Sequence, residues 1–399
     1  MDLDALALTL SEALGLLGGR LVDHGKRVAY LALTLAAEMG FSQDDLDDLR
    51  LAALLHDAGI SRQDDHERLK DLDWPDVQDH CRLGAALLSV FPPLTRAADI
   101  IRRHHDRWTD LNASDVPEDV ARLANLVCLA DRIDFLIDWD VELILDRHRV
   151  ENEVHAMAGS FFDPRSLDAL KRMSQVEVFW LKLYPHHLDT ALIHFRPPQP
   201  ITVGLDDLEI LASIFGTIVD NKSPYTKGHS IGVSQLCDLF ANRLNLPDES
   251  VKKLRIAGFI HDLGKLAVPD SILEKPGSLN ADEFQVVKRH PFETYYVLSA
   301  VPQLAEIRDW ASFHHEKPDG SGYPFHLTEK DYTVEHIIVM MSDKIQALIQ
   351  DRPYRPALER EEVLDILEHL TAAHPMYEPV MAVIRADYDS VALRAITGA

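Results

Sequence analysis

Residues 251–265 read VKKLRIAGFIHDLGK, and this stretch decides the fold. Its apolar residues recur at spacings of three and four, which is the period of an amphipathic α-helix. Residues 49–60, LRLAALLHDAGI, repeat both that spacing and the His-Asp pair. Each stretch ends near a glycine suited to a helix C-terminus, Gly264 and Gly59. Strand-like alternation is scarce elsewhere, so the sequence predicts an all-α protein.

The two halves of the chain repeat one another. In each half the His-Asp pair begins 32 residues after a first histidine, and a His-His pair begins 24 residues after a later single histidine. A late aspartate follows in both halves, within LADRIDFLID and MSDKIQALIQ. A repeat of about 200 residues indicates two tandem domains, because the units of a solenoid have about 20 to 50 residues.

The clearest break between the halves is the proline-rich segment RPPQP, residues 196–200. Prolines cannot continue a helix, so this segment predicts a short, stiff linker. We therefore expect an N-terminal domain over residues 1–195, a linker over 196–204 and a second domain over 205–399. Residues 1–19 carry acidic side chains and lack a basic start, so they indicate an amphipathic helix and not a signal peptide.

Seven residues of metal-binding type keep their order in each half. In the C-terminal half they are His229, His261, Asp262, His290, His314, His315 and Asp343. In the N-terminal half they are His24, His56, Asp57, His80, His104, His105 and Asp131. Imidazole and carboxylate together suit Fe, Mn or Zn, and the lack of thiolates argues against a structural zinc site.

The paired motifs also suit a centre of two metal ions. Adjacent ligands on a helix point about 100° apart, so a His-Asp or His-His pair can flank one metal cluster from a single turn. A carboxylate has two oxygens and can bridge two ions. A site of this kind lowers the pKa of a water and stabilises an in-line displacement at phosphorus.

These residues resemble the motifs of a known family. The stretch HDLGK, residues 261–265, is similar to the HD signature of metal-dependent phosphohydrolases. The stretch HHE at 314–316, followed by DGSGYP at 319–324, resembles the signature of the HD-GYP subfamily. SPYTKGH at 223–229 and DRPYR at 351–355 are also similar to family segments. The resemblance covers about residues 205–388 and implies two tandem HD-type helical domains, the first without a GYP motif.

The resemblance implies a phosphodiesterase that hydrolyses the second messenger c-di-GMP at two divalent metal ions, Fe or Mn. One ion would be held by His229, His261, Asp262 and Asp343. Asp262 would bridge to a second ion, held by His290, His314 and His315. The catalytic residues would be Asp262, which holds a bridging hydroxide that attacks the phosphodiester, and Lys265, which neutralises charge on the phosphate. The substrate contacts would be Lys265, Tyr323, Arg352 and Arg355, and the GYP loop would also be a docking surface for signalling proteins.

The sequence departs from the family pattern in three places. Tyr225 occupies a position where some members carry a glutamate that helps hold a third ion, so we expect two ions. Gln346 replaces a common aspartate, which weakens a hydrogen bond to a metal ligand or alters the choice of nucleotide. In the N-terminal half, Ile60 stands where the other half has Lys265, and no GYP follows His105.

The N-terminal half is therefore expected to assemble a metal cluster without hydrolysing a dinucleotide, as a regulatory or sensory domain. A hydrolase with another substrate, or an ion that only ties helices together, are alternatives for it. For the whole chain, three functions stay open. They are a c-di-GMP phosphodiesterase regulated by its N-terminal HD domain, a 3′3′-cGAMP or linear dinucleotide phosphodiesterase, and a signalling adaptor that binds nucleotide without turnover.

Composition limits the partners. The formal net charge of −25 disfavours nucleic acid polymers and anionic membranes, and requires local positive charge wherever an anionic substrate binds. No apolar run reaches the roughly 18 residues of a membrane span. Three widely spaced cysteines imply no disulfide framework, so a reducing cytoplasm is the expected location. A homodimer is the default expectation for such an enzyme.

Overall fold

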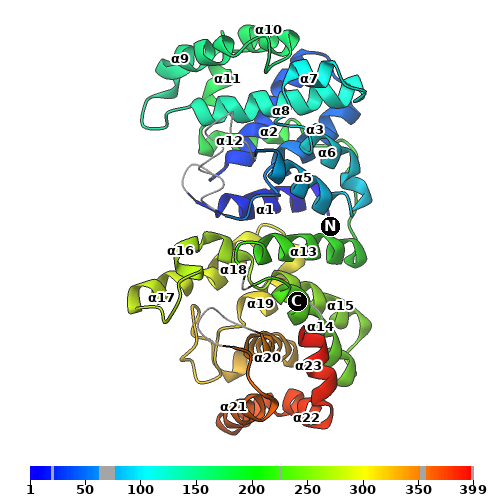
Figure 1. Cartoon of the computed structure of the whole chain (residues 1–399), viewed down its shortest axis with the longest axis vertical. Coiled ribbons are helices and arrows are strands. Elements are labelled where there is room, and N and C mark those ends of the chain that lie inside the picture. The colour runs from blue at the N-terminus through cyan, green and yellow to red at the C-terminus, as the bar shows by residue number, and fades with distance from the viewer. Residues whose placement is uncertain (19–21, 63–76, 225, 351–355, 397–399) are drawn as a thin grey trace. The chain divides into compact units, whose positions relative to one another are not determined.

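The computed structural model describes residues 1–18, 22–62, 77–224, 226–350 and 356–396 (Figure 1). Over these residues the chain forms helices joined by turns, with two isolated β-bridges and no strand. The expectation of an all-α protein is confirmed. None of the described helices is long and apolar enough to cross a membrane.

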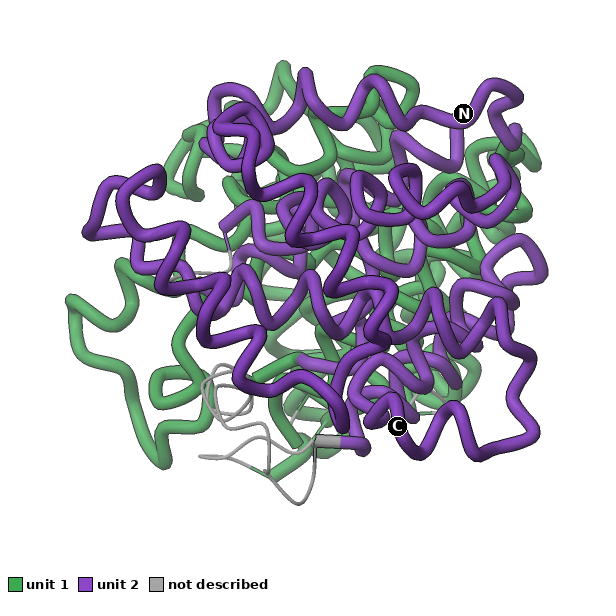
Figure 2. The backbone as a smooth tube through the Cα atoms, turned by 90° about the horizontal axis from the view of Figure 1, so that it is seen from above, with its two compact units in different colours: residues 1, 61–63, 203–399 green, residues 2–60, 64–202 purple. Residues whose placement is uncertain are grey.

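The chain divides into two compact units, which Figure 2 shows in two colours. The amino-terminal unit comprises residues 2–60 and 64–202, and the carboxyl-terminal unit comprises residues 1, 61–63 and 203–399. The predicted linker, residues 196–204, includes the point at which one unit gives way to the other.

The helices of the amino-terminal unit carry the first set of histidines. They are α1 (Leu3–Gly15), α2 (His24–Glu38), α3 (Gln43–Leu55), α5 (Val77–Leu88), η2 (Pro92–Leu94), α6 (Thr95–Ile101), α7 (Trp108–Asn112), α8 (Glu118–Leu136), α9 (Leu143–Ala156), α10 (Pro164–Met173), α11 (Glu177–Leu181) and α12 (Pro185–Ile193). Helix α1 confirms the amphipathic helix expected at the start of the chain, since it buries Leu3, Leu6 and Leu14.

The carboxyl-terminal unit has a parallel series of helices. They are α13 (Leu205–Asp220), α14 (His229–Arg243), α15 (Asp248–Ile260), η3 (Leu263–Ala267), α16 (Asp270–Leu273), α17 (Ala281–Val287), α18 (His290–Leu298), η4 (Pro302–Leu304), α19 (Ala305–Ser312), η5 (Glu329–Asp331), α20 (Val334–Ile349), α21 (Arg360–Ala373), η6 (Pro375–Tyr377), α22 (Glu378–Ala386) and α23 (Tyr388–Ile396).

Each unit is built around one central helix that begins with a histidine. Helix α2 packs against α3 and α8, and α14 packs against α15 and α20. The residue before each central helix has a left-handed backbone, with φ of 61° at Asp23 and 74° at Gly228. This turn ends the preceding segment sharply, so that the first turn of the helix, with His24 or His229, lies in the interior.

The two glycines after the His-Asp pairs act differently from what their sequence suggests. Helices α3 and α15 end at Leu55 and Ile260, and neither Gly59 nor Gly264 has a positive φ. The prediction that they serve as helix C-caps is therefore wrong. A Cβ on Gly264 would lie 2.0 Å from the carbonyl oxygen of His290, and one on Gly59 would lie 2.0 Å from that of His80. These glycines permit the close backbone approach that brings the single histidine to the His-Asp pair.

The variant Gly264→Ala tests this packing. Because the clash is with backbone, we expect a loss of about 3 kcal/mol, or a fall of about 6–12 °C in the unfolding midpoint. Scanning calorimetry measures this change. Gly204→Ala is the matched control, since nothing lies within 4 Å of its Cβ position. Equal midpoints for the two variants would contradict the role given to Gly264.

Candidate metal centres

Five helices of the carboxyl-terminal unit bring the seven predicted residues together. His229 and His290 begin α14 and α18, and Asp343 lies within α20. The pair His261-Asp262 follows α15, and the pair His314-His315 follows α19. Both pairs thus lie just beyond the last residue of a helix, and His261 keeps helical backbone angles, with φ of −57° and ψ of −34°. Each pair reaches the cluster from a single turn, as the sequence predicted.

The first subsite is formed by two histidine nitrogens, each of which lies within 4 Å of an oxygen of Asp262 and of Asp343. The Nε2 atom of His229 is 3.1 Å from Nε2 of His261 and 3.3 Å from Oδ1 of Asp343. The Asp262 Oδ2 atom is 3.3 Å from His229 Nε2 and 3.2 Å from His261 Nε2. These separations match the distances between neighbouring ligands of one metal ion, which are about 3 Å when each bond is about 2.1 Å.

The second subsite lies on the other oxygen of the same carboxylate. Asp262 Oδ1 is 3.4 Å from His290 Nε2 and 3.7 Å from His314 Nε2. The Nε2 atoms of His290 and His314 are 3.2 Å apart, and a ring nitrogen of His315 lies within 4.8 Å of both. Asp262 therefore faces one set of histidines with each oxygen, which is the arrangement of a carboxylate that bridges two ions.

The histidines are held in place from their outer side. His261, His290 and His314 each donate from Nδ1 to a backbone carbonyl three residues earlier, over 2.9, 2.7 and 2.6 Å respectively. His229 donates from Nδ1 to the amide oxygen of Gln346. These bonds leave each Nε2 free to bind a cation at the centre. Gln346 thus keeps the hydrogen bond to a candidate ligand, with a neutral acceptor in place of a carboxylate.

The electrostatics divide the centre into two halves. Burial opposes the charged form of His261, but the Asp262 and Asp343 carboxylates outweigh it and raise its pKa to about 10. Burial dominates at the second subsite and lowers the pKa of His290 to about 3 and of His314 to about 4. Oδ1 of Asp262 is buried and accepts no hydrogen bond from the described residues. The buried carboxylate of Asp262 and the half-buried one of Asp343, with unprotonated imidazoles on one side, fit divalent cations well.

A cavity of about 480 Å³ opens beside this centre. It is lined by candidate site residues Lys265, His314, His315, Tyr323 and Asp343, and also by Lys317 and Lys344. Lys265 Nζ lies 2.5 Å from Asp262 Oδ2. The cavity is in the size range of small-molecule sites, and its three lysines supply the local positive charge that an anion needs in this acidic chain.

The GYP loop is fixed to the edge of the cavity. An isolated β-bridge between Asp319 and Thr328 closes the loop at its base. The Glu316 carboxylate accepts backbone hydrogen bonds from Phe325, His326 and Leu327, over 2.5, 3.2 and 3.0 Å. This places Tyr323 against the His315 ring, with the ring centroids 5.1 Å apart. The sequence contains the HHE motif, but the anchoring role of its glutamate emerges only from the folded loop.

The amino-terminal unit repeats the centre with its own ligands. His24 Nε2 lies 3.2 Å from His56 Nε2, 3.2 Å from Asp131 Oδ1 and 3.6 Å from Asp57 Oδ2. The Nε2 atoms of His80 and His104 are 3.3 Å apart, and the His105 ring packs on that of His104. All seven predicted residues therefore lie in one cluster. The cavity lined by His24, His56, Asp57 and Ile60 has only about 20 Å³.

Two residues of this second cluster are absent from the sequence-based set. Asp134 accepts a hydrogen bond of 2.7 Å from His24 Nδ1 and pairs with the Arg27 guanidinium. The sequence does indicate Asp134 by its position. It lies three residues after Asp131, just as Gln346 lies three residues after Asp343. Cys81 lies beside His80, and its sulfur joins the ring nitrogens of His80, His104 and His105 within 4.8 Å. The expectation that no thiol accompanies the ligands is therefore wrong for this unit.

Three residues that the sequence singled out, Tyr225, Arg352 and Arg355, lie outside the described residues. The structure therefore gives no account of the guanidinium contacts expected for the dinucleotide.

Metal affinity at the carboxyl-terminal centre should fall as pH falls. The raised pKa of His261 keeps this imidazole protonated at neutral pH in the absence of metal, and an ion binds only the neutral form. For each proton that the ion must displace, the metal affinity falls about tenfold with every pH unit below about 10. Competition between the protein and a chelator for Mn²⁺, measured from pH 6 to 8 and corrected for the chelator's own protonation, tests this. A constant affinity over that range would contradict it.

Comparison with known proteins agrees with this geometry. Models of the HD domain match residues 213–379 and residues 21–136. The chain is 33% identical over 385 residues to 3′3′-cGAMP-specific phosphodiesterase 1 of Vibrio cholerae, covering 94% of this chain and 89% of the relative. It is 28% identical to 3′3′-cGAMP-specific phosphodiesterase 3 of the same organism, over 92% of this chain and 90% of that one.

Other relatives match one part of the chain. A cyclic di-GMP phosphodiesterase of Pseudomonas aeruginosa is 39% identical over 141 residues, 35% of this chain and 34% of its own length. Among solved structures, that of a cyclic GMP-AMP specific phosphodiesterase of V. cholerae, V-cGAP3, shares the fold. Its TM-score is 0.66 at 24% identity, over 96% of this chain and 98% of that one. The chain is thus an enzyme with two HD domains in tandem, and it belongs to the HD-GYP family of cyclic dinucleotide phosphodiesterases.

Proposed function

We propose that the carboxyl-terminal unit hydrolyses 3′3′-cGAMP, with two divalent metal ions held by its seven histidines and aspartates. The observation that carries the proposal is the Asp262 carboxylate, which faces a separate set of histidines with each oxygen, beside a cavity of about 480 Å³. Two ions there would supply Lewis acidity and lower the pKa of a water. We propose iron or manganese as the two ions, because imidazole and carboxylate donors together suit both metals.

The choice of 3′3′-cGAMP rests on the relatives that share both domains. Phosphodiesterases 1 and 3 of V. cholerae, which match more than nine tenths of this chain, are named for that substrate. The second candidate is c-di-GMP, the expectation from the motifs, because a c-di-GMP phosphodiesterase matches about a third of the chain at higher identity. The two substrates differ in one base, so a few contacts to the base edge decide between them.

Each residue at the cavity has a distinct role in the proposal. Asp262 and Asp343 hold the cations, and Lys265 neutralises the phosphate because its ammonium group lies beside Asp262 at the cavity wall. Lys317 and Lys344 attract the second phosphate, and Tyr323 offers an aromatic face to a base. Binding at these positions would orient the scissile bond toward the metal centre.

The amino-terminal unit is proposed to regulate and not to hydrolyse. A cavity of about 20 Å³ touches its cluster at His24, His56 and Asp57 and has room for about one water. Ser11 and Leu14 of α1 line that cavity, together with Ile60 in the place of Lys265. At the position of Lys265 this unit therefore presents the apolar side chain of Ile60, which offers no charge to a phosphate.

Paired variants test the assignment. Asp262→Asn should lower turnover by at least about 10³-fold, because it weakens the bridge between both ions. Asp57→Asn, the matching change in the other unit, should retain turnover within about tenfold. Both are assayed without oxygen, with Fe²⁺ or Mn²⁺, on 3′3′-cGAMP and c-di-GMP side by side. Faster turnover of c-di-GMP would overturn the choice of substrate, and no turnover of either with metal bound would favour a binding adaptor.

The anchoring of the GYP loop gives a separate prediction. Glu316→Gln removes the negative charge that holds three backbone amides, and hydrogen bonds to a charged group contribute about 1.5–3 kcal/mol. We expect the amides of Phe325 and Leu327 to exchange with deuterium about 10–100-fold faster, and KM to rise. Glu329→Gln, a change outside this network, is the control. Unchanged exchange in Glu316→Gln would refute the anchoring role.

A further inference from the structure

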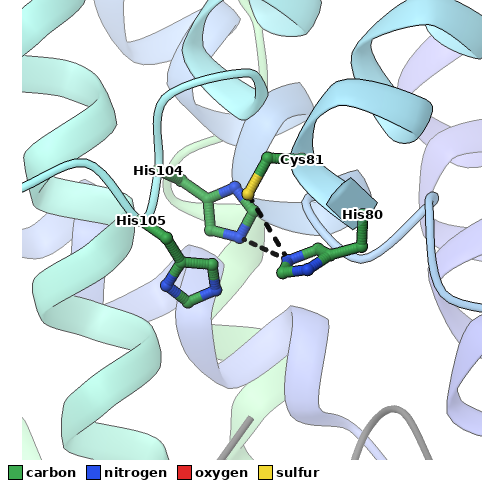
Figure 3. Close-up of side chains that lie close together, drawn as sticks. All are labelled: His80, Cys81, His104 and His105. Carbon is green, nitrogen blue, oxygen red and sulfur yellow. Dashed lines mark hydrogen bonds between the residues drawn. The ribbon is translucent and has the colours of Figure 1, made fainter. Parts of the chain in front are cut away.

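The amino-terminal unit contains a group of four donors that includes a thiol. Cys81 follows His80 on α5, and His104 and His105 lie in the turn after α6. Figure 3 shows the four side chains pointing toward one another. The Cys81 sulfur lies 3.6 Å from His80 Nε2, which is 3.3 Å from His104 Nε2. One donor atom from each of the four residues lies within 4.8 Å of the others.

These separations fit one tetrahedral ion. With metal–nitrogen bonds of about 2.0–2.1 Å and a metal–sulfur bond of about 2.3 Å, the tetrahedral angle places two nitrogens about 3.4 Å apart and nitrogen and sulfur about 3.6 Å apart. The distances from His80 Nε2 to the Cys81 sulfur and to His104 Nε2 agree with those values to about 0.1 Å. His80, Cys81 and His104 are thus spaced as ligands of one ion, and a ring nitrogen of His105 lies within 4.8 Å of their donor atoms.

The surrounding backbone holds the donors in this position. The backbone amide of His105 donates a hydrogen bond to the Cys81 sulfur. His104 donates from Nδ1 to the carbonyl of Ile101 over 2.7 Å, which leaves Nε2 for the cluster. Cys81 and His104 have no exposed surface, and His80 is 8% exposed. Such outer bonds and burial are typical of built metal sites.

The equivalent position in the other unit has no donor. Pro291 follows His290 at the start of α18, where Cys81 follows His80 within α5. The carboxyl-terminal centre thus offers three histidines and one oxygen of Asp262 to its second subsite. The amino-terminal centre adds the Cys81 sulfur to its three histidines, and the carboxyl-terminal centre has no thiol at that position.

We propose that Cys81 binds metal as a thiolate and completes a closed His80-Cys81-His104-His105 site for one zinc-like divalent ion. Sulfur changes the metal preference, because a thiolate favours Zn²⁺ over the harder Mn²⁺. A site with four protein ligands and no open position binds its ion for structure or sensing and does not activate water. The two centres of one chain would then differ in metal as well as in activity.

Cobalt is the probe for this site, because Co²⁺ replaces Zn²⁺ and reports its ligands by absorption. The full-length protein is freed of metal, kept reduced and titrated with Co²⁺ without oxygen. We expect a thiolate-to-cobalt charge-transfer band in the near ultraviolet, saturating at one equivalent, and intense visible bands of a tetrahedral ion. Cys81→Ser should lose the near-ultraviolet band and bind zinc about 100-fold more weakly.

Cys128→Ser is the matched control, because Cys128 is a buried cysteine of the same unit that is not one of the four donors. It should keep the band. A band that survives in Cys81→Ser, or disappears in Cys128→Ser, would overturn the proposal. Should Cys81→Ser fail to fold by circular dichroism, X-ray absorption at the zinc edge of the unaltered protein decides. One sulfur at about 2.3 Å supports the site, and nitrogen and oxygen alone refute it.

Discussion

The buried carboxylate of Asp262 is the constraint on which the carboxyl-terminal unit depends. It is 2% exposed, and a charge so far from water is costly unless positive charge faces it. Without metal, protons on His229 and His261 supply that charge. Burial alone would raise the pKa of Asp262, but His261, Lys265 and His229 outweigh it and hold this pKa well below its usual range. Metal ions can replace those protons without moving the ligands, since each ring is already fixed by an outer hydrogen bond. Helices α14, α15, α18, α19 and α20 meet at Asp262 because each of them positions at least one of the seven candidate ligands.

The same arrangement of ligands supports two different sites because the units differ at positions beside the shared ligands. Lys265 corresponds to Ile60, Pro291 to Cys81 and Gln346 to Asp134. The first exchange removes the cation that would face a phosphate, and the second adds a thiol. The third gives His24 a charged acceptor, and burial, which would lower its pKa, is outweighed by Asp131 and Asp134, which raise it to about 10. Chemistry is therefore changed at the edges of the cluster while the shared ligands are kept.

The sequence was sufficient to predict the fold class, the repeat and the gathering of both ligand sets, because residue type and spacing along the chain can be read directly from the sequence. It did not predict the role of Gly264, since a helix cap and a close backbone approach both require glycine and only the partner distinguishes them. Cys81 was missed for a similar reason. A lone cysteine next to one ligand carries no sign of which helix face it occupies, and only packing brings His104 and His105 to it. Glu316 likewise gains its partners from a loop that closes around it.

The two centres illustrate why an open position, and not the ligand count, separates a hydrolase from a metal-binding domain. A phosphodiester needs a place for water, a cation for its charge and a cavity for its bases, and all three adjoin Asp262. A closed site needs none of these, and a bound ion stabilises the folded unit in proportion to the logarithm of its concentration over its dissociation constant. In the scheme proposed above, duplication of one helical domain would let one copy keep the reaction while a metal ion bound by the other copy stabilises the fold.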